Sequence, residues 1–440
     1  MYKPDLEEDF EALYGQEGFR PDPYGGLQIP VGRCQRMCSY PEMQERELNR
    51  RLSKYETLND TSYPPKVDFE LAIKEFRRSC GQEFTRTEDL RPWTVLKRTL
   101  RHLLLTICFQ EDDWMFICDF VFDRLKAVRQ DMVIQRIEGR RYIEVLEGSV
   151  RFLIYSMYRL TCTVRDYCKM NFLKPIISLE GQVSGLNNYE MNVVREMKLT
   201  MKSLRDCISS LLVQYEENVP DSQNRSLFEA VNLIVNLPFL HGHVTKSTEY
   251  QARSELRNQD PIFKLVFKMY REHLIGNHWT ALKYLPLLSE QPLLVLAYAP
   301  AIAHLQVHLV NLLKKLYQAT GSNTSTVKQL CDIICPEWLD EDEDERLLFG
   351  RFIATQFGFY DEKRKLCDYK MSKPGKKIVP GDFVEKSRLE RLKVTAGGHD
   401  DNETRTYALQ MIAGRDWYFY REVLRISGVE KVLDPCQPAP

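Results

Sequence analysis

The chain has 440 residues, enough for about two or three domains and a sizeable hydrophobic core. Hydrophobic residues make up 43% of it and charged residues 28%, which excludes a disordered, low-hydrophobicity chain. The formal net charge is −1 at pH 7, so the molecule as a whole is no polycation, and any nucleic-acid site must be a local patch.

The sequence has neither a secretory leader nor a membrane span that we can identify. The first residues are acidic and lack the apolar stretch of a signal peptide, and no apolar run reaches 18 residues. The 12 cysteines are scattered and form no CxxC pair. These features predict an intracellular protein in a reducing compartment, without membrane association, whose thiols are mostly small buried hydrophobic side chains.

Residues 1–30 carry no core pattern and are expected to form a flexible tail. Pro41 suits a first helical turn, and the good helix formers after it predict a charged helix that lies on another surface. The apolar residues of segment 66–77 have a roughly helical spacing, which predicts a second helix. A third helix is expected to begin at Pro92.

Long amphipathic helices follow, because apolar residues recur every three or four positions over segments 114–136 and 140–162. The pattern continues in segments 188–215, 225–237, 260–275, 277–289 and 300–318. Strand signal is scarce before residue 320, so helical hairpins are expected to stack into an array. We find no strict 34-residue period, which argues against a regular tetratricopeptide consensus.

The composition changes after residue 320. Ser325 or Thr326 can cap a helix that reaches residue 334, and the acidic run in segment 339–359 suits the first turn of a second helix. Segment 365–385 then predicts two short strands around a Pro-Gly turn. Two helices followed by a two-stranded wing is the order of a winged-helix module.

The predicted fold class is therefore mainly α, with a stacked helical-hairpin array of the PCI/TPR-like kind followed by a winged-helix module with a small β-wing. The predicted divisions are a tail over 1–30, a helical-repeat domain over 31–320, a winged helix over 321–392, and an extension over 393–440 with one helix and a disordered end.

Cys34 and Cys38 lie close enough to suggest a metal site or a redox pair. Zinc usually takes two close pairs of ligands and no second pair follows, while a redox pair would favour a CxxC turn. The favoured interpretation is two buried thiols that pack a turn after Gly32. His241 and His243 could chelate, but no carboxylate or cysteine cluster accompanies them. We predict no metal and no cofactor.

The sequence contains no GxSxG, HExxH, P-loop or GxGxxG motif. We therefore predict a protein that is not an enzyme and has no small-molecule substrate.

Two surfaces are candidates for binding. The first is a cluster of lysines on the predicted wing, which either contact nucleic-acid phosphates or solubilise a sheet edge: Lys370, Lys373, Lys376 and Lys377. The second is an aromatic cluster near the C-terminus, which either forms a partner surface or packs on the winged helix: Trp417, Tyr418 and Tyr420.

The segment "VGRCQRMCSYPEMQERELNRRLSKYE" resembles the signature G-x-C-x-x-M-C-x-x-x-E-x-x-x-R of the GANP, or Sac-three, family, which includes a yeast mRNA-export scaffold. The residues that match it as they stand are Gly32, Cys34, Met37 and Cys38. The later stretches "AIKEFRRS", "DLRPWTVLKRTLRHLL", "DFVFDRLKAVRQDMVIQ" and "LEGSVRFLIYSMYRL" also resemble the family. Structural signature residues in the third stretch are Arg124, Arg129 and Asp131. Arg36 and Ser39 depart from the usual pattern.

The resemblance implies a helical-repeat region that ends in a winged helix and pairs with another PCI-type subunit. Large family members join a nuclear complex that couples transcription to mRNA export, and their paired winged helices can touch nucleic acid. The length of this chain resembles that of the short, single-domain animal member, which is associated with centrosome duplication and spindle assembly.

We therefore expect a non-enzymatic scaffold, located in the nucleus and cytoplasm, that binds centrosomal proteins or a PCI-type subunit in centrosome duplication, spindle assembly and mitotic progression. The alternative is a subunit of a nuclear mRNA-export or processing complex that pairs with a PCI-type partner and makes a weak RNA contact.

Overall fold

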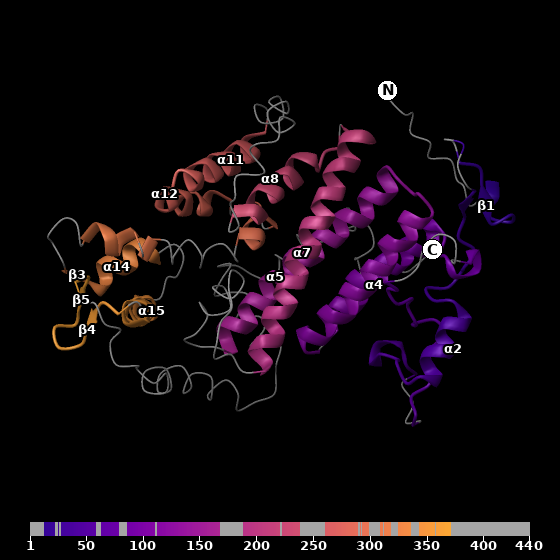
Figure 1. The fold of residues 1–440 in the computed structure, drawn as a ribbon, viewed down its shortest axis with the longest axis horizontal. Helices are drawn as coiled ribbons and strands as arrows, with labels where there is room; N and C mark the ends of the chain where they lie inside the picture. The colour runs from indigo at the N-terminus through magenta and orange to yellow at the C-terminus, as the bar shows by residue number, and fades with distance from the viewer. Residues whose placement is uncertain are drawn as a thin grey trace, which may run out of the picture. The chain divides into compact units, whose positions relative to one another are not determined.

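The protein is mainly helical in the computed structural model, which confirms the mainly α class that the sequence predicted (Figure 1). The structure describes residues 13–22, 25, 28–58, 63–78, 86–110, 112–167, 188–220, 222–237, 260–288, 291, 293–298, 309–310, 312–317, 324–335, 343–356 and 358–370. The chain divides into two compact units, one of Met1–Ser156 with Lys202–Arg225 and one of Met157–Met201 with Ser226–Pro440.

The first unit opens with short elements. Strand β1 (Phe19–Arg20) pairs antiparallel with β2 (Ile29–Pro30). Helix α2 (Tyr40–Leu48) carries a proline in its first turn, as the sequence predicted, and a 3₁₀ turn, η1 (Lys54–Glu56), follows it. Although α2 is charged, its Met43 is fully buried beside Cys38, Val67 and Ala72.

Segment 66–77 forms no helix, so this prediction was wrong. The Ala72 amide donates to the Asp68 carbonyl four residues back, but the amides that follow it are taken by distant partners. The amide of Ile73 donates to Glu56 Oε1 at 2.9 Å, that of Lys74 to the Met37 carbonyl at 3.0 Å, and that of Glu75 to Glu42 Oε1 at 2.8 Å. Tertiary hydrogen bonds therefore outweigh the helical spacing of the apolar residues.

The long helices of the first unit agree with the predicted spacing. After the 3₁₀ turn η3 (Thr87–Asp89), Pro92 occupies the N-cap of α3 (Trp93–Arg101). The chain continues through a π-helical turn, η4 (His102–Thr106), and a 3₁₀ turn, η5 (Ile107–Phe109). Helix α4 (Trp114–Ile134) is capped by Asp113, whose side chain accepts from the Met115 amide.

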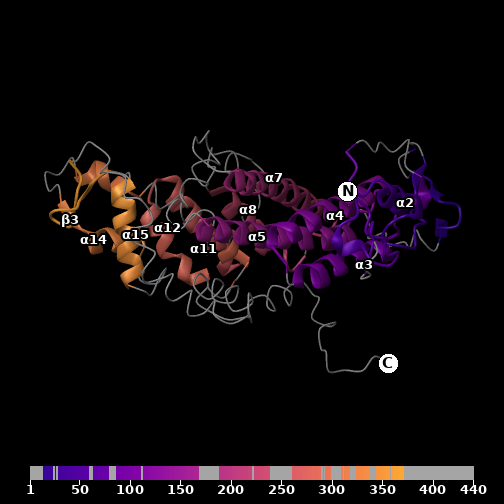
Figure 2. The same ribbon diagram turned by 90° about the horizontal axis from the view of Figure 1, so that it is seen from below.

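The core of this unit lies where α4 meets two longer helices, α5 (Arg140–Tyr167) and α7 (Asn188–Glu217). Residues 140–156 of α5 and 202–217 of α7 belong to the unit, and the three helices run side by side in Figure 1 and Figure 2. The side chains they bury include Val121, Val128, Leu146, Val150, Leu204 and Leu211. Burial of one stripe on each helix is what the three-and-four spacing predicted.

The second unit contains α8 (Arg225–Asn236), α11 (Pro261–Leu274), α12 (His278–Lys283) and the 3₁₀ turn η7 (Leu285–Leu288). The helix predicted over 277–289 is broken near Pro286, because proline lacks the amide hydrogen that a helix interior needs. Only part of the predicted helix 300–318 is described, and its residues 309–310 and 312–317 are helical.

The last described elements are β3 (Thr324–Thr326), α14 (Val327–Ile334), α15 (Glu343–Gln356), β4 (Tyr360–Asp361) and β5 (Leu366–Asp368). The strands form an antiparallel sheet in the order β3-β5-β4. Thr326 caps α14 in a capping box with Gln329, which confirms the predicted cap. The second strand of the predicted wing lies outside the described residues, so the winged helix stays a prediction.

None of the described helices is both long and apolar enough to cross a membrane.

Candidate functional site

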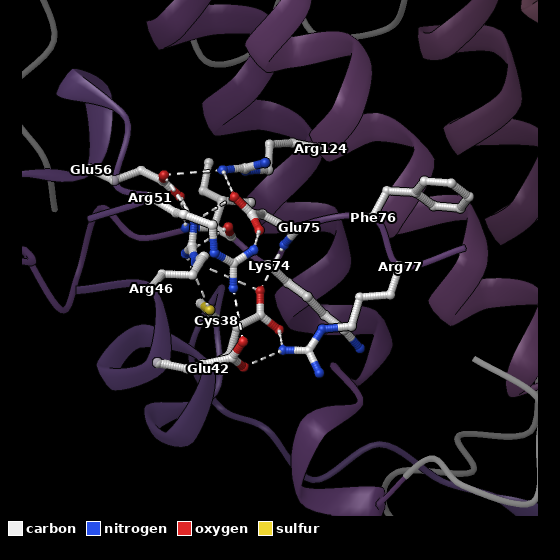
Figure 3. A network of polar contacts seen from close by, with 12 residues as sticks. Cys38, Glu42, Arg46, Arg51, Glu56, Lys74, Glu75, Phe76, Arg77 and Arg124 are labelled. Carbon is white, nitrogen blue, oxygen red and sulfur yellow. Dashed lines mark hydrogen bonds and ion pairs between the residues drawn. The ribbon is translucent and has the colours of Figure 1, made fainter. Parts of the chain in front are cut away.

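A buried ionic cluster lies at the junction of α2, η1 and α4 (Figure 3). Arg46 Nη1 donates to both carboxylate oxygens of Glu56 at 2.9 Å, and Arg124 Nη2 donates to Glu56 Oε2 at 3.0 Å. Arg46 and Glu56 are 0% exposed, and the Arg124 side chain is 6% exposed. One carboxylate therefore holds two arginines from elements far apart in the chain. We call Arg46, Glu56 and Arg124 the Glu56 cluster.

The local sequence sets the position of Glu56. Ser53 caps η1, and the Glu56 carboxylate returns the interaction by accepting from the Ser53 amide at 3.3 Å. The carboxylate also accepts from the Ile73 amide at 2.9 Å. These backbone hydrogen bonds satisfy the lone pairs that the two arginines leave free, which a buried carboxylate requires.

Two further carboxylates form the rim of the Glu56 cluster. Glu75 lies 3.7 Å from Arg46, 3.5 Å from Arg124 and 3.1 Å from Arg51. Glu42 lies 3.8 Å from Arg46 and 3.5 Å from Arg77. Burial by itself disfavours the charge on Arg46, but Glu56, Cys38 and Glu42 outweigh it and raise the pKa of the guanidinium above its ordinary value. Arg46 is therefore a permanent cation.

A second buried cluster surrounds Asp131 of α4. Its carboxylate binds Lys74 Nζ at 2.7 Å and Arg91 Nε at 2.7 Å, and it is 0% exposed. Lys74 also donates to the Asp89 carbonyl at 2.7 Å. Asp131 therefore ties the irregular segment before α3 to the long helix α4, as Glu56 ties α2 to the same helix.

Gly32 packs against the backbone of Leu90 and Arg91, beside the Asp131 cluster. Its amide donates to Gln135 Oε1 at 2.7 Å, and Gln135 Nε2 donates to the Arg91 carbonyl at 2.9 Å. A Cβ atom on Gly32 would lie 2.7 Å from the Arg91 carbonyl carbon and 2.8 Å from the Leu90 oxygen. Only glycine, which has no Cβ atom, allows the chain to come this close to the backbone of Leu90 and Arg91. This steric limit explains the glycine at the first position of the signature.

Cys34 and Cys38 are both buried. Burial, followed by the charge of Glu42, raises the pKa of Cys38 to about 12, although Arg46 Nη2 lies 3.5 Å from its sulfur. The Cys34 thiol donates to the Arg36 carbonyl at 3.2 Å, and burial also raises its pKa. Each sulfur is held as a neutral thiol, which is neither a good nucleophile nor a ready metal ligand. Across the described part of the chain, no three His, Cys, Asp or Glu side chains gather as a metal site.

The predicted signature residues are only partly brought together. Arg124 and Asp131 form the two ionic clusters, and the Met37 carbonyl accepts from Arg91 Nη1 at 3.4 Å as well as from Lys74. Arg129 lies apart from both clusters, on another face of α4, where its Nη2 is 3.5 Å from Ser203 Oγ.

The predicted binding surfaces are mostly beyond the described residues. Lys370 is exposed, and its amide donates to Asp368 Oδ1 at 3.0 Å. The positions that fall outside the described residues are Lys373, Lys376, Lys377, Trp417, Tyr418, Tyr420, His241 and His243. Their proposed roles stay predictions.

Sequence reasoning missed the central carboxylate, Glu56, and its partner Arg46. A signal was present for Arg46, because the E-x-x-x-R end of the signature falls on Glu42 and Arg46, spaced by one helical turn. Nothing in the local sequence indicates that Glu56 binds Arg124, since these residues are 68 positions apart.

The fold and these clusters define a mainly helical domain whose N-terminal segments are fixed by buried ion pairs to its first long helix. Residues 37–171 match the SAC3/GANP family, and this match covers α2, the ionic clusters and the whole of α4 and α5. The chain is therefore similar to the SAC3/GANP family over this region.

Three relatives share this region. The chain is 31% identical over 161 residues to SAC3 family protein 1 of Schizosaccharomyces pombe, covering 35% of this chain and 15% of that protein. It is 30% identical over 160 residues to SAC3 family protein B of Arabidopsis thaliana, covering 35% of this chain and 9% of that protein. It is 29% identical over 139 residues to Protein xmas of Drosophila melanogaster, covering 29% of this chain and 6% of that protein.

Proposed function

We propose that this chain is a non-enzymatic scaffold that binds other proteins. The observation that carries the proposal is how the charged side chains are paired in the region that matches the family. The cations and carboxylates of the Glu56 and Asp131 clusters are buried and paired with one another. Charged groups held in this way fix the relative positions of segments and are poorly placed to bind or transform a substrate.

Two cellular settings suit such a scaffold. The first is centrosome duplication, spindle assembly and mitotic progression, with centrosomal partners. The second is a nuclear mRNA-export or processing complex, with a PCI-type subunit as partner and a weak RNA contact through the lysines after β5. The three relatives support membership of the family and favour neither setting, because the matched region is 15% or less of each of those proteins.

Affinity purification from dividing cells tests the two settings directly. The tagged full-length chain would be compared with the Glu56→Ala variant, in which the family region is expected to lose its fixed geometry. A PCI-type subunit recovered with mRNA-export proteins supports the second setting. Centrosomal and spindle proteins without such a subunit support the first. A catalytic activity of the purified chain on a small molecule would overturn the scaffold proposal.

The RNA contact has its own test. The double variant Lys376→Glu, Lys377→Glu removes two lysines of the candidate wing. If those lysines bind RNA phosphates, affinity and its dependence on salt both fall in the variant. Unchanged RNA binding would remove these lysines from the proposal.

A further inference from the structure

A pocket of about 600 Å³ lies in the first unit, on a face of α4 away from the two ionic clusters. It is bounded by α4, by residues 203–210 of α7, by Tyr142 of α5 and by Phe76. The volume is within the range of roughly 300–1,000 Å³ that is typical of ligand sites. It could therefore accept one or two side chains of a partner.

Two cations of α4 border this pocket, Lys126 and Arg129. They are three residues apart and so project from the same face of the helix. Neither forms an ion pair with any residue that the structure describes, whereas Arg46, Arg91 and Arg124 all do. Among the described residues, Arg129 makes a long hydrogen bond from its Nη2 to Ser203 Oγ, at 3.5 Å.

The surroundings of Lys126 offer aromatic rings and a carboxylate that it shares with other groups, instead of an ion pair of its own. Its Nζ lies 4.1 Å from the ring centroid of Phe122 and 5.6 Å from that of Phe76. Burial, followed by repulsion from Arg129, lowers the pKa of the amine. The nearby carboxylate of Asp123 already accepts from Arg124 and from the Phe76 amide. The two cations repel each other, and an incoming anion would relieve that repulsion.

The rest of the pocket is apolar with a few polar groups. Ile134 and Leu146 line it and are buried, at 5% and 1% exposure, while Val133 at its edge is 58% exposed. Asp206 is exposed on α7 and contributes one negative charge to the lining. This combination suits an apolar side chain next to a carboxylate. It is less suited to a nucleic-acid backbone, which needs a row of cations instead of two.

We propose that this pocket docks an acidic segment of a partner protein, with a carboxylate between Lys126 and Arg129 and a neighbouring apolar side chain against Ile134 and Leu146. The inference rests on the proposed scaffold function and names the chemistry of one partner contact. It concerns residues that the buried ionic clusters do not use.

The test is a selection of random peptides on phage against the full-length chain, followed by fluorescence anisotropy of a selected peptide at near-physiological salt. Selected peptides are expected to carry Asp or Glu beside a large apolar residue. The double variant Lys126→Glu, Arg129→Glu should weaken peptide binding at least about tenfold, because repulsion replaces attraction. Ser210→Trp, which keeps both cations but fills the pocket from α7, should weaken it as well.

Arg101→Glu is the matched control, because Arg101 is an exposed cation of α3 outside the pocket. It should leave the affinity for the peptide within about twofold of the original chain, since exposed and distant charges are largely screened. Circular dichroism of each variant checks that the helices are retained.

Three outcomes would overturn the proposal: no peptide selected, peptides without acidic residues, or an affinity that the pocket variants leave unchanged. Single-stranded RNA that binds in place of peptide, and is lost in the double variant, would also overturn it and assign the pocket to nucleic acid. The scaffold function is judged separately by copurification, so either proposal can fail alone.

Discussion

Arg46 and Glu56 are joined by two hydrogen bonds of 2.9 Å, and neither side chain is exposed to solvent. The pair links α2 to the 3₁₀ turn η1, and Arg124 extends it to α4. Such a pair contributes little net stability relative to apolar residues, but breaking it leaves an uncompensated buried charge. Its value to the protein is therefore the fixed arrangement of three segments.

Glu56→Ala is expected to destabilise the first unit by about 3–5 kcal/mol, because Arg46 and Arg124 lose their shared carboxylate inside the protein. Urea unfolding followed by circular dichroism measures the change in free energy. Glu45→Ala is the control, since the pair of Glu45 with Arg51 is about half exposed and should contribute about 1 kcal/mol or less. Equal losses in the two variants would contradict the buried pair's structural role.

Gly32→Ala should cost about 1–3 kcal/mol, because its Cβ would meet the backbone of Leu90 and Arg91 at 2.7–2.8 Å. The matched control is Gly148→Ala in α5, whose Cβ would meet the flexible end of Leu104 at 3.2 Å. There the better helix propensity of alanine offsets the contact, so a change near zero is expected. Thermal unfolding compares the stability of the two variants. Equal losses would contradict the claim that position 32 has no room for a Cβ atom.

The Cys38 thiol should resist iodoacetamide at pH 8 in the native protein. Its pKa of about 12 lies well above that pH, so little of the reactive thiolate is present. Its side chain is also 0% exposed, so the reagent cannot reach the sulfur. Mass spectrometry of the alkylated protein, before and after unfolding in urea, locates the modified cysteines. Rapid native labelling of Cys38 would contradict the buried position.

Cys38→Ala tests the structural role of the same residue. The variant leaves a small cavity beside Met43 and removes the contact with Arg46, so the melting temperature should fall. Elemental analysis should find no stoichiometric zinc in either protein. Zinc bound at one equivalent in the original chain and lost in the variant would overturn the structural interpretation.

Asp260 caps α11 in the second unit. Burial alone would raise the pKa of its carboxyl, but hydrogen bonds from the Ser226 hydroxyl and the amides of Phe263 and Ile262 outweigh it and lower the pKa below its usual value. A depressed carboxyl pKa gives stability that is present above the unfolded pKa, about 3.9, and is lost as the pH falls through the folded value.

Asp260→Ala should therefore destabilise α11 by about 0.5–2 kcal/mol at pH 7. The difference from the original chain should shrink as the pH falls below about 3.9 and through the lower pKa of the folded carboxyl, where the cap becomes protonated. Hydrogen exchange of peptides from α11 follows both effects, and Asp260→Asn, which keeps an acceptor at the cap, is the control. A difference that is independent of pH would contradict the ionised cap.

Sequence periodicity was enough to locate the long helices. In α4 the five apolar positions from Ile117 to Met132 are 2% exposed or less, as a regular stripe requires. The cap at Thr326 could also be predicted, because the Ser/Thr-x-x-Gln pattern acts within four residues. Segment 66–77 had the same kind of spacing and forms no helix, since its amides bind Glu56, Glu42 and Met37.

The sequence by itself determined the helical class of the protein, its family region and the residue types that occupy the signature. These follow from short-range patterns of apolar residues, caps and prolines. Only the tertiary structure decided that Glu56 binds Arg124, that Asp131 binds Lys74 and Arg91, and that Lys126 and Arg129 form no ion pair with a described residue. The physical reason is that the partners of a buried charge are chosen by which segments pack together, and that packing depends on contacts between residues far apart in the chain.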